Sequence, residues 1–141
     1  MPTAAIVHRS HTGTTRHLAE EIGAHLEGRG ITTTVQSVGD ADPAALAGVD
    51  LLLLGCWTSG LFVVAQHPDQ PWMAFVSELP TLGKARIGLF TTYKLATGSM
   101  FARMRAALAG KADRIDLELK SRNGRLSAAD RLALDRLIAA G

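Results

Sequence analysis

The sequence predicts an α/β fold of three layers, in which a five-stranded parallel sheet of order 2-1-3-4-5 has helices on both faces. Strand-like and helix-like patterns alternate along all 141 residues, and this alternation is typical of a parallel sheet with helical crossovers. The second and fifth strand patterns are partly polar and indicate edges, whereas the first, third and fourth indicate interior strands. With 47% hydrophobic and 20% charged residues, one domain over residues 1–141 is expected.

The first half of the chain is expected to supply three strands and two helices. Leu18, Ile22 and Leu26 recur at the spacing of one helix face. Three threonines at 32–34 favour a strand, and its mixed polarity places it at an edge. Four consecutive leucines at 51–54 predict a strand that is covered on both faces. The expected elements are strand 4–7, helix 14–27, strand 31–38, a short helix 42–47 opened by Asp-Pro, and strand 49–55.

The second half is expected to begin with a long loop at 56–71 and then to supply two strands and three helices. Loops of this length within a compact domain are usually functional or mobile. Ile115, Leu117 and Leu119 alternate with charged residues, as in a strand with one wet face. Ser127 and Asp130 have the spacing of a capping box. The expected elements are helix 72–79, strand 87–91, helix 99–110, strand 115–119 and helix 127–138.

A loop of small hydroxyl residues, Ser-His-Thr-Gly-Thr-Thr at 10–15, joins the first strand to the first helix. A loop in this place presents backbone N–H groups and the positive end of the helix dipole, so it can hold a dianion such as a phosphate ester. The hydroxyls of Ser10, Thr12, Thr14 and Thr15 would add donors. A helix cap with a turn is the simpler alternative for the same residues.

Three loops are expected to meet in one crevice. The strand order reverses between the first and third strands, and ligands of open α/β sheets bind beyond the carboxyl ends of the strands at such a point. Both tryptophans and the one tyrosine of the chain, Trp57, Trp72 and Tyr93, lie in or beside two of these loops. Trp57 and Tyr93 are suited to stack on the two faces of a flat ring, while the first loop holds its phosphate. The alternative is that both only cap the sheet.

The loop at 10–15 resembles the phosphate-binding signature of the flavodoxins, a hydroxyl residue followed by x-Thr-Gly-x-Thr after the first strand. Ile6, Val7, Ala19 and Ile22 also fall at the spacing of that family, whereas His8 stands where an aromatic residue is usual. By this resemblance the chain is a short-chain flavodoxin-like protein, and residues 1–141 form a flavodoxin-like FMN-binding domain that needs no catalytic side chain. The implied FMN contacts are Ser10, His11, Thr12, Gly13, Thr14 and Thr15 at the phosphate, and Trp57, Thr58, Ser59, Gly60, Thr92, Tyr93, Lys94 and Gly98 at the ring.

The charge of the chain departs from the acidic character of the flavodoxins. Residues 1–83 carry 3 basic and 8 acidic side chains, whereas residues 84–141 carry 12 basic and 5 acidic ones. Lys94 beside the ring, with Arg9 and His11 near the phosphate, would favour anionic reduced flavin, so we expect a less negative potential than in a typical flavodoxin. The basic half would suit an acidic partner, and solvated surface is the simpler interpretation. The apolar stretch 61–65 would shield the ring, form a docking patch or be buried within the domain.

Several other classes of protein are excluded. A low-molecular-weight phosphatase needs Arg six residues after its Cys, but Phe62 stands at that distance from Cys56, and no P-loop or Rossmann glycine motif occurs. We expect Cys56 to be an inert packing thiol, and His67 and Asp69 to lie in a turn rather than at a metal. The apolar runs are too short to span a membrane, no secretory signal is expected, and the basic residues lack interleaved aromatics. We therefore expect a cytoplasmic protein that binds neither metal, membrane nor nucleic acid.

The expected function is electron transfer. The chain would bind FMN and carry electrons between a reductase and an acceptor enzyme, as a redox carrier rather than a turnover enzyme. Two alternatives stay open. One is an oxidoreductase of the same fold that acts directly on a bound quinone or tetrapyrrole, and the other is an FMN-free module that docks a partner through its basic half. The sequence does not specify the redox partners or the oligomeric state.

Overall fold

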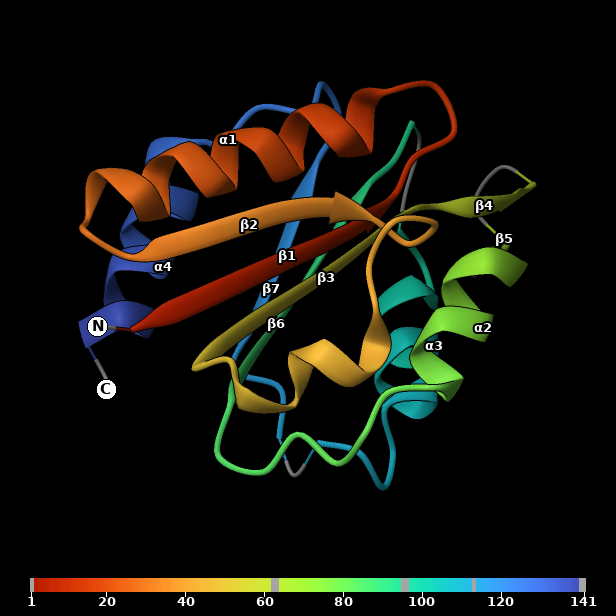
Figure 1. Ribbon diagram of the computed structural model, residues 1–141. Coiled ribbons are helices and arrows are strands. Elements are labelled where there is room, and N and C mark those ends of the chain that lie inside the picture. Colours follow the sequence, from red (N-terminus) through yellow and green to blue (C-terminus); the bar gives the residue numbers. More distant parts are fainter. Residues whose placement is uncertain (1, 62–63, 95–96, 113, 140–141) are drawn as a thin grey trace.

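The computed structural model describes residues 2–61, 64–94, 97–112 and 114–139. Five strands form the main sheet in the order β2-β1-β3-β6-β7, and all neighbouring pairs run parallel (Figure 1). This is the predicted order of a doubly wound sheet. The elements are β1 (Thr3–Arg9), α1 (Thr14–Gly28), β2 (Thr32–Ser37), the 3₁₀ helix η1 (Pro43–Gly48), β3 (Leu51–Trp57), β4 (Ser59–Leu61), β5 (Val64–His67), α2 (Gln70–Ser77), β6 (Arg86–Thr92), α3 (Met100–Ala107), β7 (Leu117–Ser121) and α4 (Ala128–Ala139).

Helices cover both faces of the sheet, as predicted. The helices α1 and α4 lie on one face, and η1, α2 and α3 lie on the other (Figure 1). Each face has its own cluster of buried apolar side chains, one formed with residues of α1 and α4 and one with residues of η1, α2 and α3. The burial of these two apolar layers is the main force that holds the three layers together.

The central strand β3 is buried on both sides. Leu52 and Leu54 pack in the cluster with α2 and α3, whereas Leu51 and Leu53 pack in the cluster with α1 and α4, because successive side chains point to opposite faces. At Gly55 an added Cβ would lie 2.0 Å from the Phe90 ring, so β3 and β6 can approach here only with glycine. The prediction of a strand covered on both faces is confirmed.

The edge strands are also where the sequence placed them. The side chains of β2 alternate between exposed and half-buried, and those of β7 alternate between exposed and more buried positions. The last strand begins at Leu117 rather than at Ile115 and ends at Ser121. In α4, Leu134 and Leu137 are buried, whereas the side chain of Leu132 is 51% exposed.

The segment 56–71 differs most from the sequence expectation, which was a loop. The strand β3 continues through Trp57, and β4 and β5 then form an antiparallel hairpin in which Ser59 pairs with His67. This hairpin and the loop after β1 lie at the same end of the main sheet (Figure 1). The hairpin therefore borders the region where the three loops were expected to meet.

Side-chain caps explain where several helices begin. Asp69 accepts a hydrogen bond from the backbone N–H of Trp72, so α2 starts two residues earlier than expected. The capping box of α4 is formed as predicted, with Ser127 N–H donating to the Asp130 carboxylate and Asp130 N–H donating to the Ser127 hydroxyl.

Within the described ranges, no helix combines the length and the hydropathy that a membrane crossing requires.

Candidate functional site

The loop between β1 and α1 makes a tight, exposed turn into the helix. Gly13 precedes the helix with φ of +93°, a left-handed conformation that favours glycine. Its N–H donates to the Ser10 hydroxyl at 2.9 Å, and its carbonyl accepts from His17 N–H at 3.0 Å. The hydroxyl oxygens of Thr12 and Thr14 lie 3.5 Å apart beside it. The hydroxyls of Ser10, Thr12 and Thr14 thus lie beside the N-terminus of α1, and a helix N-terminus is a place where anions can bind.

Hydroxyl groups join the three predicted loops into one site. The hydroxyls of Thr15 and Thr92 lie 2.5 Å apart and are buried, which ties the first loop to the end of β6. The hydroxyls of Thr58 and Thr91 are 2.8 Å apart, and Thr91 also donates to the Cys56 carbonyl at 2.6 Å. The backbone N–H of Thr58 donates to the Thr92 carbonyl. These threonine contacts therefore tie the ends of the three loops together.

Trp57 lies next to the phosphate-type loop. The imidazole of His11 stacks on its indole with ring centroids 4.5 Å apart and planes inclined by 24°. This is the geometry of an aromatic stack, so the imidazole covers the indole face that lies on the side of the first loop. Trp72 is fully buried in the core cluster of α2 and α3, so of the two tryptophans only Trp57 contacts this loop.

The side chain that holds Trp57 is Asp69, at the start of α2. Its carboxylate oxygen Oδ2 accepts from the indole Nε1 of Trp57 at 2.8 Å and from Nε of Arg9 at 2.7 Å. Its other oxygen, Oδ1, faces the Cys56 thiol at 3.7 Å and the N–H of Trp72 at 3.4 Å. Asp69 was expected in a turn, and its contacts with Trp57 and Arg9 were not predicted. The Asp-x-Pro pattern signals a helix cap, but the partners come from the ends of other strands.

Tyr93 lies on the other side of the site, at the end of β6. Its N–H donates to the Ser121 carbonyl of β7, and its ring faces two cations, with Lys120 Nζ at 5.8 Å and Arg122 Cζ at 5.3 Å from the centroid. Such cation–π contacts stabilise the ring position. Lys94 is exposed beside it. Among the described residues, the three basic side chains near Tyr93 form no ion pair with a carboxylate.

Ser59, Gly60 and Gly98 were also predicted to contact the ring of FMN. Ser59 and Gly60 belong to β4, and Gly98 has φ of +50° in the loop before α3. The apolar stretch 61–65 includes residues 62 and 63, which lie outside the described residues, so its role stays a prediction.

Two titratable groups under the loops are held neutral by burial. Burial raises the pKa of the Cys56 thiol far above its usual range, which agrees with the expected inert packing thiol. Burial, and secondarily the charge of Arg16, lowers the pKa of His8. The Nδ1 atom of His8 is buried without a hydrogen-bond partner among the described residues. His8 is therefore a neutral packing residue under α1.

No group of three metal-ligating side chains occurs in the part of the chain that the structure describes. The imidazole Nδ1 of His67 lies 2.9 Å from the carbonyl of Pro68, and the neighbouring Asp69 caps α2. His67 is the last residue of β5 and Asp69 is the N-cap of α2, whereas the sequence had placed both in a turn.

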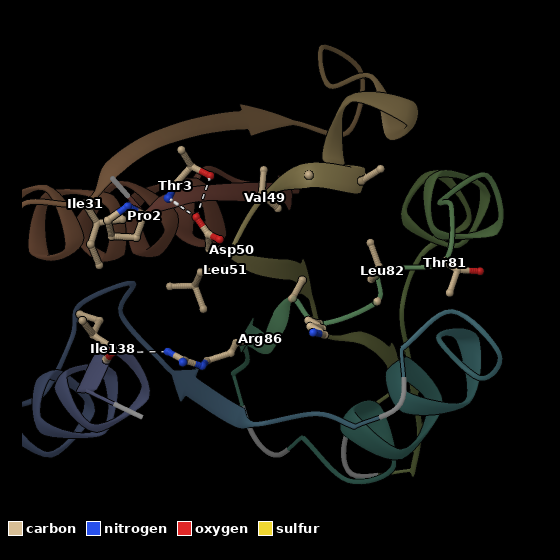
Figure 2. Close-up of a pocket in the computed structure, with 15 residues that line it drawn as sticks. Pro2, Thr3, Ile31, Val49, Asp50, Leu51, Thr81, Leu82, Arg86 and Ile138 are labelled. Carbon is tan, nitrogen blue, oxygen red and sulfur yellow. Dashed lines mark hydrogen bonds between the residues drawn. The ribbon is translucent and has the colours of Figure 1, made fainter. Parts of the chain in front are cut away.

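A cavity of about 610 Å³ lies at the opposite end of the sheet (Figure 2). Its walls include Thr3, Asp50 and Arg86, which stand at or just before the beginnings of β1, β3 and β6. The Asp50 carboxylate accepts from the N–H and hydroxyl of Thr3, and the guanidinium of Arg86 donates to the carbonyls of Leu137 and Ile138. These groups join the strand starts to α4. The cavity lies at the amino ends of the strands, away from the three loops.

No protein-family model matches the chain. Among solved structures, a two-electron reduced flavodoxin of Megasphaera elsdenii is 20% identical with a TM-score of 0.77, covering 98% of this chain and 99% of that one. A flavodoxin of Streptococcus pneumonia TIGR4 is 17% identical with a TM-score of 0.74, covering 97% and 95%. Rubredoxin oxygen:oxidoreductase of Desulfovibrio gigas is 14% identical with a TM-score of 0.74, covering 97% of this chain but 34% of that one.

These similarities establish the fold. The chain has the flavodoxin fold over nearly its whole length, as the resemblance of residues 10–15 implied. At identities of 20% and below, the shared architecture alone does not assign a ligand or an activity.

Proposed function

We propose that this chain binds FMN noncovalently at the carboxyl ends of the strands and carries electrons between a reductase and an acceptor. The observation that supports this most directly is the contact between the first loop and Trp57. An anion-binding loop and an aromatic face lie side by side, with the His11 ring already stacked on the indole at 4.5 Å. A phosphate ester joined to a flat ring system fits this pair of subsites.

In this proposal the chain's residues bind and orient the cofactor. The hydroxyls and N–H groups at 10–14 hold the phosphate, Trp57 stacks on one face of the ring, and Tyr93 with Lys94 borders the other. The flavin itself supplies the one- or two-electron redox chemistry. The buried hydroxyl contact of Thr15 with Thr92 keeps the phosphate loop and the ring loop in register.

The charge around Tyr93 supports two further parts of the proposal. Lys94, Lys120 and Arg122 place positive charge where flavin reduction adds negative charge, so the potential of the bound flavin is less negative than that of a typical flavodoxin. The same cations suit an acidic surface on a redox partner. A redox titration that gives a very low second potential would contradict the first part. The proposed location is the cytoplasm, and the proposed domain is the whole chain, residues 1–141.

The test is to purify the protein without added cofactor, record its visible spectrum, and titrate apoprotein with FMN while flavin fluorescence is followed. Yellow protein, or stoichiometric quenching of FMN fluorescence, is the expected result. Riboflavin, which lacks the phosphate, should bind more weakly than FMN. Colourless protein that leaves FMN fluorescence unchanged would refute the proposal, and the loop at 10–15 would then be a helix cap.

A further inference from the structure

One carboxylate gathers contacts from three segments that border the proposed FMN site. Asp69 accepts from Trp57 Nε1 at 2.8 Å and from Arg9 Nε at 2.7 Å, both at Oδ2, and Oδ1 faces Cys56 and the N–H of Trp72. Arg9 ends β1, directly before the phosphate-type loop, and Trp57 ends β3. The carboxylate thus links the loop end of β1, the aromatic residue at the end of β3 and the beginning of α2.

Helix capping alone does not account for these contacts. The capping bond to Trp72 is long, 3.4 Å, whereas the bonds that the same carboxylate accepts from Arg9 and Trp57 are 2.7 and 2.8 Å, which makes them the stronger ones. Asp42 caps η1 in the same way but accepts only from Ala44 N–H among the described contacts. The side chain of Asp69 is 12% exposed, so its bonds are shielded from water.

We propose that Asp69 is a positioning residue for the cofactor: it fixes the orientation of the Trp57 indole on which the FMN ring stacks. This inference rests on the proposed function. An indole has one N–H, and a bond from that N–H to a fixed acceptor removes the rotation of the ring about its side-chain bonds. Arg9, held on the same oxygen, keeps the end of β1 and the indole together. Binding then does not have to order the indole first.

The geometry of the carboxylate gives a selective test. In Asp69→Asn, only one of the two terminal atoms accepts hydrogen bonds. Its one oxygen accepts either from Trp72 N–H or from Trp57 and Arg9, and as a neutral acceptor it binds the indole N–H and the guanidinium more weakly than the carboxylate does. In Asp69→Ser, a short hydroxyl can still cap the helix and cannot replace the carboxylate at Trp57. Asp42→Asn is the matched control. Asp42 also caps a helix, but among the described contacts its side chain accepts only from Ala44 N–H of that same helix.

The experiment measures FMN affinity by fluorescence titration for these variants in two backgrounds, wild type and Trp57→Phe, which keeps an aromatic face but removes the N–H. With Trp57 present, Asp69→Asn and Asp69→Ser should lower FMN affinity about tenfold, and Asp42→Asn should not change it. In the Trp57→Phe background the Asp69 substitutions should have no further effect.

A second readout follows the indole directly. In ¹H–¹⁵N spectra of the free protein, the Trp57 indole signal, assigned by its loss in Trp57→Phe, should shift in both Asp69 variants and not in Asp42→Asn. An equal loss of affinity in both backgrounds, unchanged affinity with Trp57 present, or an unshifted indole signal would overturn the positioning role. Wild-type protein that fails to bind FMN is a different result, because it would refute the proposed function itself.

Discussion

The glycine before α1 offers the most direct test of the phosphate-type loop. Gly13 has φ of +93°, and an added Cβ would meet nothing within 4 Å, so Gly13→Ala changes backbone strain alone. Gly30, after α1, has φ of +81° and equally open surroundings, which makes Gly30→Ala the matched control. An L-residue in the left-handed region costs about 1–2 kcal/mol. Both substitutions therefore introduce the same strain, one inside the proposed site and one outside it.

The strain at Gly13 must appear in one of two measurements if the loop binds FMN in this conformation. Either the free loop keeps its shape and the free energy of unfolding falls by about 1 kcal/mol, or the free loop relaxes and binding must restore the strained conformation. In the second case FMN affinity falls about tenfold. For Gly30→Ala only the unfolding free energy should fall, and FMN affinity should be unchanged.

The assay pairs urea denaturation of the apoprotein with FMN titration for wild type and both variants. Riboflavin titration adds a check, because a ligand without the phosphate should be insensitive to the loop. If the Gly13→Ala variant loses neither stability nor FMN affinity, this prediction is wrong, since the loop would then have relaxed with no consequence for the ligand. It also fails if Gly30→Ala weakens FMN binding as much as Gly13→Ala does.

Three other substitutions test separate parts of the structure. Gly55→Ala would place a Cβ 2.0 Å from the buried ring of Phe90 in β6, and it should lower the free energy of unfolding by about 3 kcal/mol in urea titrations. Gly28→Ala is the control, because its Cβ would meet nothing within 4 Å, and it should not lower the free energy of unfolding. His11→Ala removes the ring stacked on Trp57, which we expect FMN to displace, so FMN affinity should rise a few-fold; weaker binding would instead make the imidazole a ligand. The hydrogen bond from Arg29, and to a smaller extent that from His25, lowers the pKa of Asp135 to about 2. The stabilising contribution of the Asp135 carboxylate is therefore present above about pH 4 and lost towards pH 2. Thermal unfolding of wild type and Asp135→Asn should therefore differ at neutral pH and converge in acid, and parallel curves would contradict this assignment.

The fold could be predicted because its signals are local. The four leucines of β3 are consecutive and do not alternate with polar residues. Alternate leucines enter different core clusters, as a strand between two helical layers requires. The polar alternation of β2 and β7 placed them at the edges, and that determined the sheet order. Helix starts such as the Ser127 capping box also depend on residues a few positions apart.

The contacts within the site depend on residues far apart in the sequence, and these were missed. Residues 59–67 contain no Asn-Gly or Asp-Gly turn, so the hairpin β4–β5 had no short-range signal. The stack of His11 on Trp57 forms only when the ends of β1 and β3 lie side by side. The role of Asp69 depends on the same arrangement, since its partners Arg9 and Trp57 end those two strands.

The threonines of the site divide into two groups by burial, and this division limits which of them can contact a ligand. Thr15 and Thr92 are buried and face each other at 2.5 Å, so their hydroxyls hold two loops together. Thr12 is exposed and Thr14 is half-buried, both at the mouth of the loop. Because the Thr15–Thr92 contact connects the first loop to the end of β6, it fixes the position of one loop relative to the other. We therefore expect the phosphate contacts to come from Thr12, Thr14 and the loop backbone, with Thr15 acting through the shape of the site.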